Sequence, residues 1–140
     1  MSTETNKAVV RRWVEEVINK NNVEVLNETH AASHVNHFLP PGAPQGIEGE
    51  KMLTAMFDAS FSNDLVNIED LAAEGDKVAV RFTYSGTHTG PFNNIPATGK
   101  TIAVGGIFLL RFTDGKIVEN WVQFDMMSLL QQLGAIPAPA

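Results

Sequence analysis

The feature that most restricts the fold is an Asp-Gly pair at 114–115, set between two apolar runs near the C-terminal end. Asp-Gly between runs of alternating hydrophobicity is a strong signal of a tight β-hairpin. The run at 116–124 alternates, so we expect Glu119, Trp121 and Gln123 to share one face of the second strand. The chain therefore contains an antiparallel hairpin against which the other elements must pack.

Asp125 follows that strand directly, and the same alternation places it on the face of Trp121 and Gln123. Burial among apolar groups such as Phe108 and Met126 would raise the pKa of a carboxyl group and suit it to proton transfer. The other interpretation is structural, because an Asp at the start of a helix caps it and contributes about 1 kcal/mol to stability. The residues alone leave both roles of Asp125 open.

The composition excludes several classes of protein. The 140 residues fit one domain, 1–140, and the net charge of −6 without a basic stripe argues against nucleic-acid binding. The absence of cysteine excludes thiolate chemistry and disulfides. No apolar stretch approaches the roughly 18 residues of a membrane span, and the first residues do not resemble a signal peptide. We therefore expect a cytoplasmic protein that does not bind membranes.

Hydrophobic periodicity predicts three helices followed by an antiparallel meander and a short last helix. The Pro- and Gly-rich composition predicts a long irregular loop over 28–49. This order defines an α+β domain whose curved sheet wraps over the helices and encloses a cone-shaped cavity, a natural ligand site. The expected helices are 6–18, 23–26, 48–61 and 126–133, and the expected strands are 65–73, 78–85, 101–112 and 116–124.

Five motifs follow one another along the chain: Asn36-His37, Gly46–Gly49, His88–Lys100, Asp114–Trp121 and Asp125–Gly134. Together they resemble the SnoaL-like polyketide cyclases, often called ester cyclases, of the NTF2-like superfamily. The resemblance implies that the chain closes a polyketide ring by intramolecular aldol condensation, without cofactor or metal. It also implies that Asp125 is the acid/base residue and that His37 lies in the pocket.

Aromatic residues are candidates for binding a flat, polycyclic substrate. If the Asp-Gly pair at 114–115 forms a simple two-residue turn, Phe108 lies directly across from Trp121, and the two form walls of the pocket. Ordinary core packing explains each of them equally well. Trp13 on the first helix is expected mainly in the core, with a place in the substrate pocket as the alternative.

Polar residues can orient a substrate or simply support the fold. Gln123 is expected to line the pocket, where it can orient a carbonyl group or a water. Glu119 either pairs with Arg81 on that face or is solvated. His88 ends a strand, so it either points inward or anchors the loop that follows.

Three histidines, His30, His34 and His37, lie close together in the sequence. On a helix, His30 and His34 would share a face, as in some metal sites, but no Glu stands at the matching position and no fourth ligand is evident. We therefore expect no metal site. His37 is the better functional candidate, as a hydrogen-bond donor to a substrate oxygen or as a second proton relay, with a structural role as the alternative.

We expect a cofactor-free enzyme in which Asp125 and His37 transfer protons on an enolisable carbonyl substrate. The cyclases of this family also carry a His on the preceding strand, whereas the stretch 104–112 has Arg111 as its titratable residue. The alternatives are an isomerase, epoxide hydrolase or hydroxylase on the same scaffold, or a non-catalytic module that binds small molecules or oligomerises. Ile107, Leu109, Val122 and Phe124 predict a second apolar sheet face, which a homodimer, or a tetramer, would cover.

Overall fold

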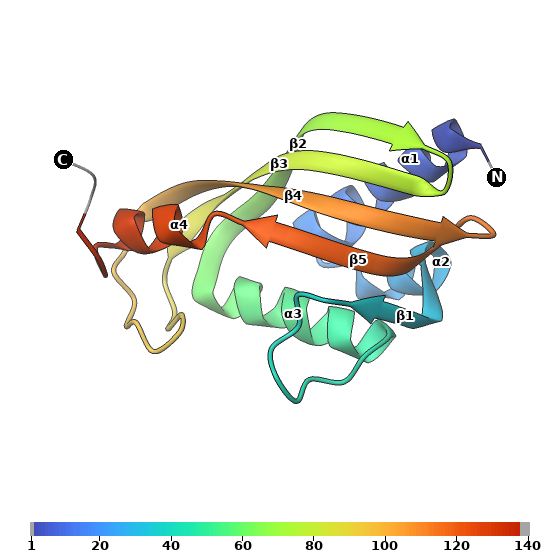
Figure 1. Ribbon diagram of the computed structural model, residues 1–140. Coiled ribbons are helices and arrows are strands. Elements are labelled where there is room, and N and C mark those ends of the chain that lie inside the picture. The colour runs from blue at the N-terminus through green and yellow to red at the C-terminus, as the bar shows by residue number, and fades with distance from the viewer. Residues whose placement is uncertain (1, 138–140) are drawn as a thin grey trace.

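The computed structural model describes residues 2–137 as a curved five-stranded sheet with helices packed against it (Figure 1). This is the expected α+β architecture. The elements are α1 (Thr3–Arg12), a π-helical segment η1 (Trp13–Asn19), a 3₁₀ turn η2 (Val23–Val25), α2 (Leu26–Thr29), β1 (His30–Asn36), α3 (Ile47–Ser60), β2 (Phe61–Glu74), β3 (Lys77–His88), β4 (Thr101–Thr113), β5 (Lys116–Phe124) and α4 (Met126–Leu133).

The first helix begins where its sequence supplies a cap. Ser2 has an extended backbone, and its hydroxyl accepts a hydrogen bond from the Thr5 backbone N–H at 3.0 Å. The helix continues into η1, and Val10, Trp13 and Val17 lie on the side that faces the sheet, each at most 3% exposed. The helical spacing of these apolar residues is the reason why the prediction of a helix over 6–18 is confirmed.

The sheet has the strand order β1-β5-β4-β3-β2, in which β1 runs parallel to β5 and all other neighbours are antiparallel. The expectation of an irregular loop over 28–49 is wrong for β1. This strand escapes sequence patterning because its buried positions, His30, His34 and Asn36, are polar. Their side chains have partners inside the protein, so the strand lacks the apolar alternation that usually reveals one.

The observed register of the β4–β5 hairpin differs from the expected one because β5 contains a β-bulge. Phe112 pairs with Ile117, but Arg111 pairs with Glu119, so Val118 has no partner opposite it. One extra residue in a strand moves every later side chain to the other face. Phe108 consequently pairs with Val122.

The prediction that Phe108 lies across from Trp121 is therefore wrong, because Trp121 pairs with Leu109. The same shift separates the four residues expected to form one outer apolar face. Ile107 and Leu109 face outward, whereas Val122 and Phe124 face the helices with Phe108.

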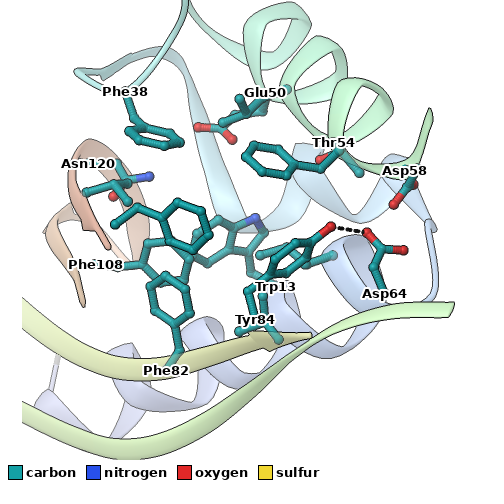
Figure 2. A pocket seen from close by; sticks show the side chains of 16 residues that line it. Trp13, Phe38, Glu50, Thr54, Asp58, Asp64, Phe82, Tyr84, Phe108 and Asn120 are labelled. Atoms are coloured by element: carbon teal, nitrogen blue, oxygen red, sulfur yellow. Dashed lines mark hydrogen bonds between the residues drawn. The ribbon is translucent and has the colours of Figure 1, made fainter. Parts of the chain in front are cut away.

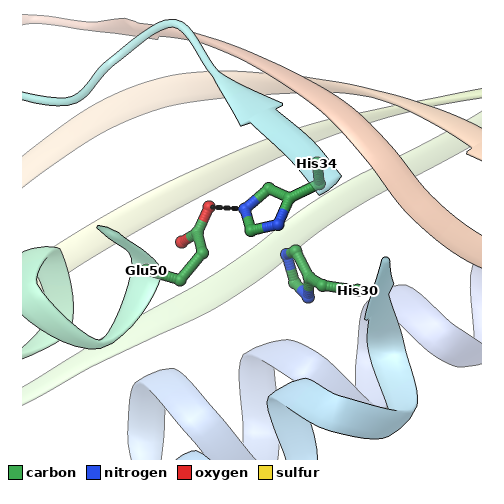
Figure 3. Close-up of side chains that lie close together, drawn as sticks. All are labelled: His30, His34 and Glu50. Carbon is green, nitrogen blue, oxygen red and sulfur yellow. Dashed lines mark hydrogen bonds and ion pairs between the residues drawn. The ribbon is translucent and has the colours of Figure 1, made fainter. Parts of the chain in front are cut away.

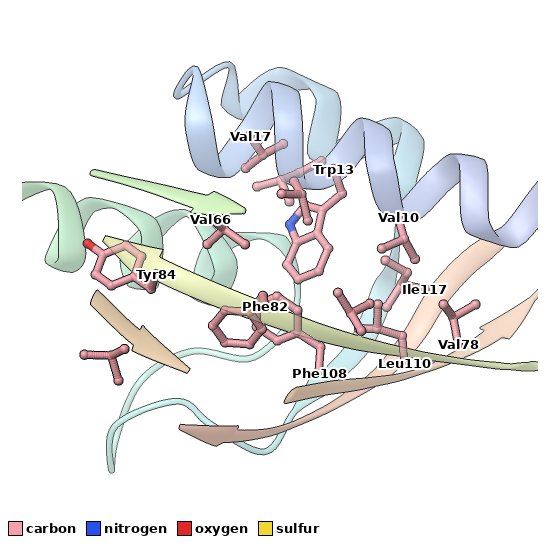
Figure 4. Packing of buried hydrophobic residues seen from close by; sticks show 14 of the residues in the cluster. Val10, Trp13, Val17, Val66, Val78, Phe82, Tyr84, Phe108, Leu110 and Ile117 are labelled. Atoms are coloured by element: carbon pink, nitrogen blue, oxygen red, sulfur yellow. The ribbon is translucent and has the colours of Figure 1, made fainter. Parts of the chain in front are cut away.

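The core fills the space between the N-terminal helices and the inner face of the sheet (Figure 4). Val10 and Val17 belong to the same cluster as apolar side chains from four strands, β2 to β5. The strand residues shown in this layer are Val66, Val78, Phe82, Leu110 and Ile117. Farther along the sheet the inner face becomes aromatic. There the Phe82 ring stacks on Phe108, with the ring centroids 4.2 Å apart.

The absence of a side chain at Gly106 leaves room for the Phe82 ring on the sheet. The two residues pair across β3 and β4, and a Cβ at Gly106 would meet the Phe82 ring and lie 2.9 Å from the Gln123 carbonyl oxygen. A Cβ at the neighbouring Gly105 would have its nearest contact at 4.0 Å. A side chain is therefore excluded at one glycine and tolerated at the next.

We predict that Gly106→Ala lowers the free energy of unfolding by about 1–3 kcal/mol, the usual cost of overpacking. Gly105→Ala is the matched control and should leave stability unchanged or slightly higher, since glycine weakens a strand. Urea denaturation of both variants measures the difference. Equal effects of the two substitutions would contradict the close approach of Phe82 to Gly106.

Candidate functional site

A pocket lies between helix α3 and the inner face of the sheet (Figure 2). Its lining is mainly apolar and rich in aromatic residues, and it comes chiefly from η1, α3 and strands β2 to β5. Aromatic side chains bind flat apolar ligands over a large area while few rotamers are lost. The aromatic lining residues include Trp13, Phe57, Phe82, Tyr84, Phe108 and Phe124.

Two carboxyl groups, Asp58 at the end of α3 and Asp64 on β2, stand beside Tyr84 on the pocket wall. The Tyr84 hydroxyl donates a hydrogen bond to Asp64 Oδ2 at 2.7 Å (Figure 2). Burial, followed by hydrogen bonding to Asp64 and repulsion from its charge, raises the pKa of Asp58 to about 7. Asp58 therefore exchanges its proton near neutral pH.

Tyr84 stays protonated at neutral pH. Burial is the main cause of its strongly raised pKa, and the nearby Asp64 adds to it. Its hydroxyl can therefore act as a donor to Asp64 or to a ligand oxygen in the pocket.

A third carboxylate, Glu50 of α3, lines another part of the pocket and is only 3% exposed. Its Oε1 accepts hydrogen bonds from Asn36 Nδ2 at 2.7 Å and from His34 Nε2 at 3.0 Å. Burial opposes ionisation of Glu50, but the hydrogen bond and charge of His34, with His30 and Asn36, lower its pKa. Glu50 is thus held as a carboxylate.

His30 stands beside this group with a pKa lowered to about 4, mainly because it is buried, so it is neutral at pH 7. Asn120 of β5 adds an amide to the pocket wall, and its Oδ1 is buried without a hydrogen-bond partner among residues 2–137. The pocket thus combines an aromatic wall with polar groups of different charge.

Of the expected site residues, the structure places Phe108 and Trp13 in this pocket. The expectation that Trp121, Gln123 and Glu119 line the pocket is wrong. The bulge at Val118 turns these three side chains to the opposite face of the sheet.

Asp125 is exposed, and its side chain accepts a hydrogen bond from the Ser128 backbone N–H at 3.1 Å as the N-cap of α4. The expectation that it shares a pocket face with Phe108 is wrong for the same change of register. The helix that it caps ends at Gly134, which has a left-handed backbone, as its sequence predicts. Met126 is half-buried against the hydrophobic core.

His37 lies on the outer side with Glu119 and Trp121. Its Nε2 is 2.7 Å from Glu119 Oε2, and its ring stacks on Trp121 at 5.2 Å. The hydrogen bond from His37, followed by those of Arg111, lowers the pKa of Glu119. The arginine that pairs with Glu119 is Arg111 and not Arg81, which instead binds Asp70 at 2.7 Å.

His88 is fully buried, and its Nδ1 accepts a hydrogen bond from the Thr98 backbone N–H at 3.2 Å. Because Thr98 belongs to the loop between β3 and β4, this contact matches the loop-anchoring alternative for His88.

The pocket carboxylates were missed in the sequence because no motif marks them. A signal existed nonetheless: Glu50, Thr54 and Asp58 are spaced by four residues and so share one side of α3 with the apolar Leu53 and Phe57. Polar groups along the apolar side of an amphipathic helix are a reason to expect a pocket.

An open, curved sheet over helices, with an aromatic pocket between the two layers, defines an NTF2-like fold. The SnoaL-like polyketide cyclase model matches residues 8–133, and the chain belongs to that family. Among curated proteins, none matches the chain.

Solved structures from several bacteria share the fold across nearly the whole chain. TsrD from Streptomyces laurentii is 26% identical, with 97% of this chain and 99% of that chain covered and a TM-score of 0.89. A candidate polyketide cyclase from Bacillus cereus ATCC 10987 is 32% identical, with 97% and 87% covered and a TM-score of 0.82. IdmH from Streptomyces antibioticus, a candidate polyketide cyclase, is 30% identical, with 92% and 98% covered and a TM-score of 0.81.

The family and these neighbours support a cyclase-like role and a small-molecule substrate. Within residues 2–137, every helix is too short or too polar to cross a membrane.

The raised pKa of Asp58 predicts a pH-dependent effect on stability. The ordinary pKa of this carboxyl group is 3.8, and folding raises it to about 7. The folded protein holds the proton more tightly than the unfolded chain, so Asp58 increasingly disfavours folding as the pH rises between these values. Asp58→Asn should therefore raise the melting temperature more at pH 8 than at pH 5.

Thermal unfolding of wild type and variant at both pH values measures this difference. Asp114→Asn is the control, because Asp114 lies in the exposed β4–β5 turn at φ 51°, a conformation that Asn also adopts. Its effect should be the same at pH 5 and pH 8. An equally constant effect of Asp58→Asn would show that the Asp58 pKa is not raised by folding.

Proposed function

We propose that this protein is a polyketide cyclase-like enzyme that binds an enolisable carbonyl substrate in the aromatic pocket and uses Asp58 as its acid/base residue. The observation that carries the proposal is the placement of Asp58, Asp64 and the Tyr84 hydroxyl on one wall of that pocket. The proposal places the proton-transfer group on α3, whereas the resemblance implies Asp125, the N-cap of α4.

The aromatic wall supports a flat substrate. Phe82 stacks on Phe108, and Phe124 lies parallel to Phe82 with centroids 6.2 Å apart. These rings present an apolar surface to the same space that Asp58 lines. A carboxyl group against such a surface is poorly solvated, which favours its neutral form and makes the carboxylate a stronger base.

The paired acids support proton transfer near neutral pH. Asp64 is held by the hydrogen bond from Tyr84, and burial of Asp58, assisted by the neighbouring Asp64, keeps the proton on Asp58 until about pH 7. A general acid/base works best when its pKa lies near the working pH, because both protonation states are then populated. Asp58 satisfies this condition.

The proposed reaction is an intramolecular aldol closure. Asp58 carboxylate removes a proton from the carbon beside a substrate carbonyl and becomes neutral, while the electron pair of the C–H bond forms an enolate. The enolate carbon attacks a second carbonyl carbon of the same molecule, so a C–C bond forms and the carbonyl π-bond breaks to an alkoxide. Asp58 returns its proton to that alkoxide, which restores the carboxylate.

Polar groups of the pocket assist these charge changes. Asn120 can donate an amide hydrogen to an enolate oxygen, and Tyr84 can donate its hydroxyl hydrogen. Tyr84 has to release its hydrogen bond to Asp64 in order to do so. We also propose a homodimer through the outer sheet face, because the apolar Ile107 is 48% exposed there.

We predict that Asp58→Asn lowers the rate of hydrogen–deuterium exchange at the α-carbon of β-keto esters by about 100-fold or more, the usual contribution of a general base. The wild-type rate should rise with pH to a plateau, with a midpoint near 7, because the base must be ionised. NMR of the substrates in D₂O measures both effects, and circular dichroism checks the fold of each variant.

Asp125→Asn is the matched variant, because Asn caps a helix as well as Asp does, so only the acid is lost. We expect it to exchange protons at the wild-type rate. Loss of exchange in Asp125→Asn alone would transfer the catalytic role to Asp125, as the resemblance implies. Exchange no faster than in buffer with wild type would favour a binding module over a cyclase for these substrates.

A further inference from the structure

A second polar cluster, His30, His34 and Glu50, is buried where the start of β1 meets α3 (Figure 3). Each of the three side chains offers one ligand atom, and these atoms all lie within 4.8 Å of one another. All three residues are at most 3% exposed. The aldol mechanism uses none of them.

The hydrogen bonds of His34 define which ring nitrogen can hold a ligand. Its Nδ1 lies 3.1 Å from the Ala31 carbonyl oxygen, which can only accept, so Nδ1 carries a hydrogen. Its Nε2 is directed at Glu50 Oε1, also an acceptor, at 3.0 Å. The bond to Glu50 therefore needs a second proton on the ring, and removal of that proton leaves a lone pair facing the carboxylate.

His30 presents a lone pair to the same space. The Thr29 hydroxyl donates to the Val25 carbonyl oxygen at 3.3 Å, so it accepts a hydrogen from His30 Nδ1 at 2.8 Å. The neutral ring then has its lone pair on Nε2, and Nε2 has no hydrogen-bond partner among residues 2–137. A buried polar atom without a partner costs free energy that a ligand would recover.

The surroundings of the cluster hold these ligand atoms in place. Asn36 Nδ2 donates to Glu50 Oε1 at 2.7 Å, and the Trp13 ring packs edge-on against His30 at 5.3 Å. The Nδ1 atoms of the two histidines are hydrogen-bonded to a backbone carbonyl and a hydroxyl. Metal-binding histidines usually make such a hydrogen bond with the ring nitrogen that does not bind the metal.

We propose that His30 Nε2, His34 Nε2 and a Glu50 carboxylate oxygen bind a divalent transition-metal ion such as Zn²⁺. Two imidazoles and one carboxylate are a ligand set of Zn²⁺ and of neighbouring transition metals, whereas Mg²⁺ prefers oxygen ligands alone. The ion takes the place of the His34 Nε2 proton, which leaves to solvent. His30 and Glu50 need release no proton.

The geometry of the cluster requires only a local contraction. Ligand atoms about 2.0–2.2 Å from one tetrahedral ion lie roughly 3.4 Å apart, so the present separations, all within 4.8 Å, must shorten by at most about 1.4 Å. Three protein ligands leave a position for water or another oxygen ligand. Because Glu50 and Trp13 also line the aromatic pocket, that position adjoins the space proposed for the substrate.

The test is titration of the metal-free, untagged protein with Zn²⁺ and Co²⁺. Calorimetry should show one ion per chain with a dissociation constant in the micromolar range or below, and Co²⁺ should give visible absorption typical of a low-coordinate site. Mg²⁺ should not bind. Zn²⁺ should also raise the melting temperature, since it binds the native state.

Three variants identify the ligands. His30→Asn and Glu50→Gln should weaken binding by about 100-fold or more, since removal of a direct ligand should cost at least as much as loss of an outer partner. His37→Asn is the matched control, because His37 lies outside the cluster and its side chain is 43% exposed. It should leave the affinity unchanged.

A measurement on wild type keeps the test valid if a variant fails to fold. Bound Zn²⁺, which is diamagnetic, should shift the imidazole proton signals of two histidines in the NMR spectrum, and those of His37 and His88 should stay in place. The proposal is overturned if Zn²⁺ does not bind at a 1:1 ratio, or if His37→Asn abolishes binding, or if the signals of His30 and His34 do not move. The cluster would then be a hydrogen-bonded structural group.

Discussion

The register of the β4–β5 hairpin decides which side chains form the pocket. A single unpaired residue, Val118, reverses the facing of every later side chain in β5. Asn120, Val122 and Phe124 thereby join the aromatic inner face, and Trp121 turns toward His37 on the other side. Without the bulge, the pocket would be lined by a different set of polar and aromatic groups.

Sequence patterns predicted the elements well and the site poorly. The helix over 6–18 and the four antiparallel strands follow from apolar periodicity, because most of their buried positions are apolar. The helix over 48–61 was also predicted, although its buried positions are Gly49, Glu50 and Ser60. β1 was missed because polar side chains occupy its buried positions. Periodicity reports burial through hydrophobicity, so it does not detect a strand whose interior contacts are hydrogen bonds.

The bulge was missed for a related reason. An Asp-Gly turn indicates where a hairpin folds back, but the residue that escapes pairing lies three positions farther on, at Val118. Nothing about a valine there distinguishes it from a paired one. Strand parity carried over this position assigned Asp125, Gln123 and Trp121 to the wrong face, whereas Phe108 and Trp13 do line the pocket.

The three pocket carboxylates occupy two different electrostatic environments. Asp58 is partly buried beside another acid and keeps its proton to about pH 7, whereas the buried Glu50 accepts hydrogen bonds from His34 and Asn36 and is held ionised. Two groups of the same chemistry therefore differ in charge at neutral pH because their neighbours differ. A substrate in this pocket would meet a proton-transfer group at one place and a fixed negative charge at another.

The parallel pairing of β1 with β5 has a consequence for the order of folding. It joins residues such as Val35 and Glu119, which are 84 positions apart (119 − 35), whereas the hairpins of β2 to β5 join nearer neighbours. Closing a long loop costs more entropy than closing a short one, so the antiparallel meander should form before β1 docks. His30 and His34 would then reach Glu50 in the last step, when most of the sheet already exists.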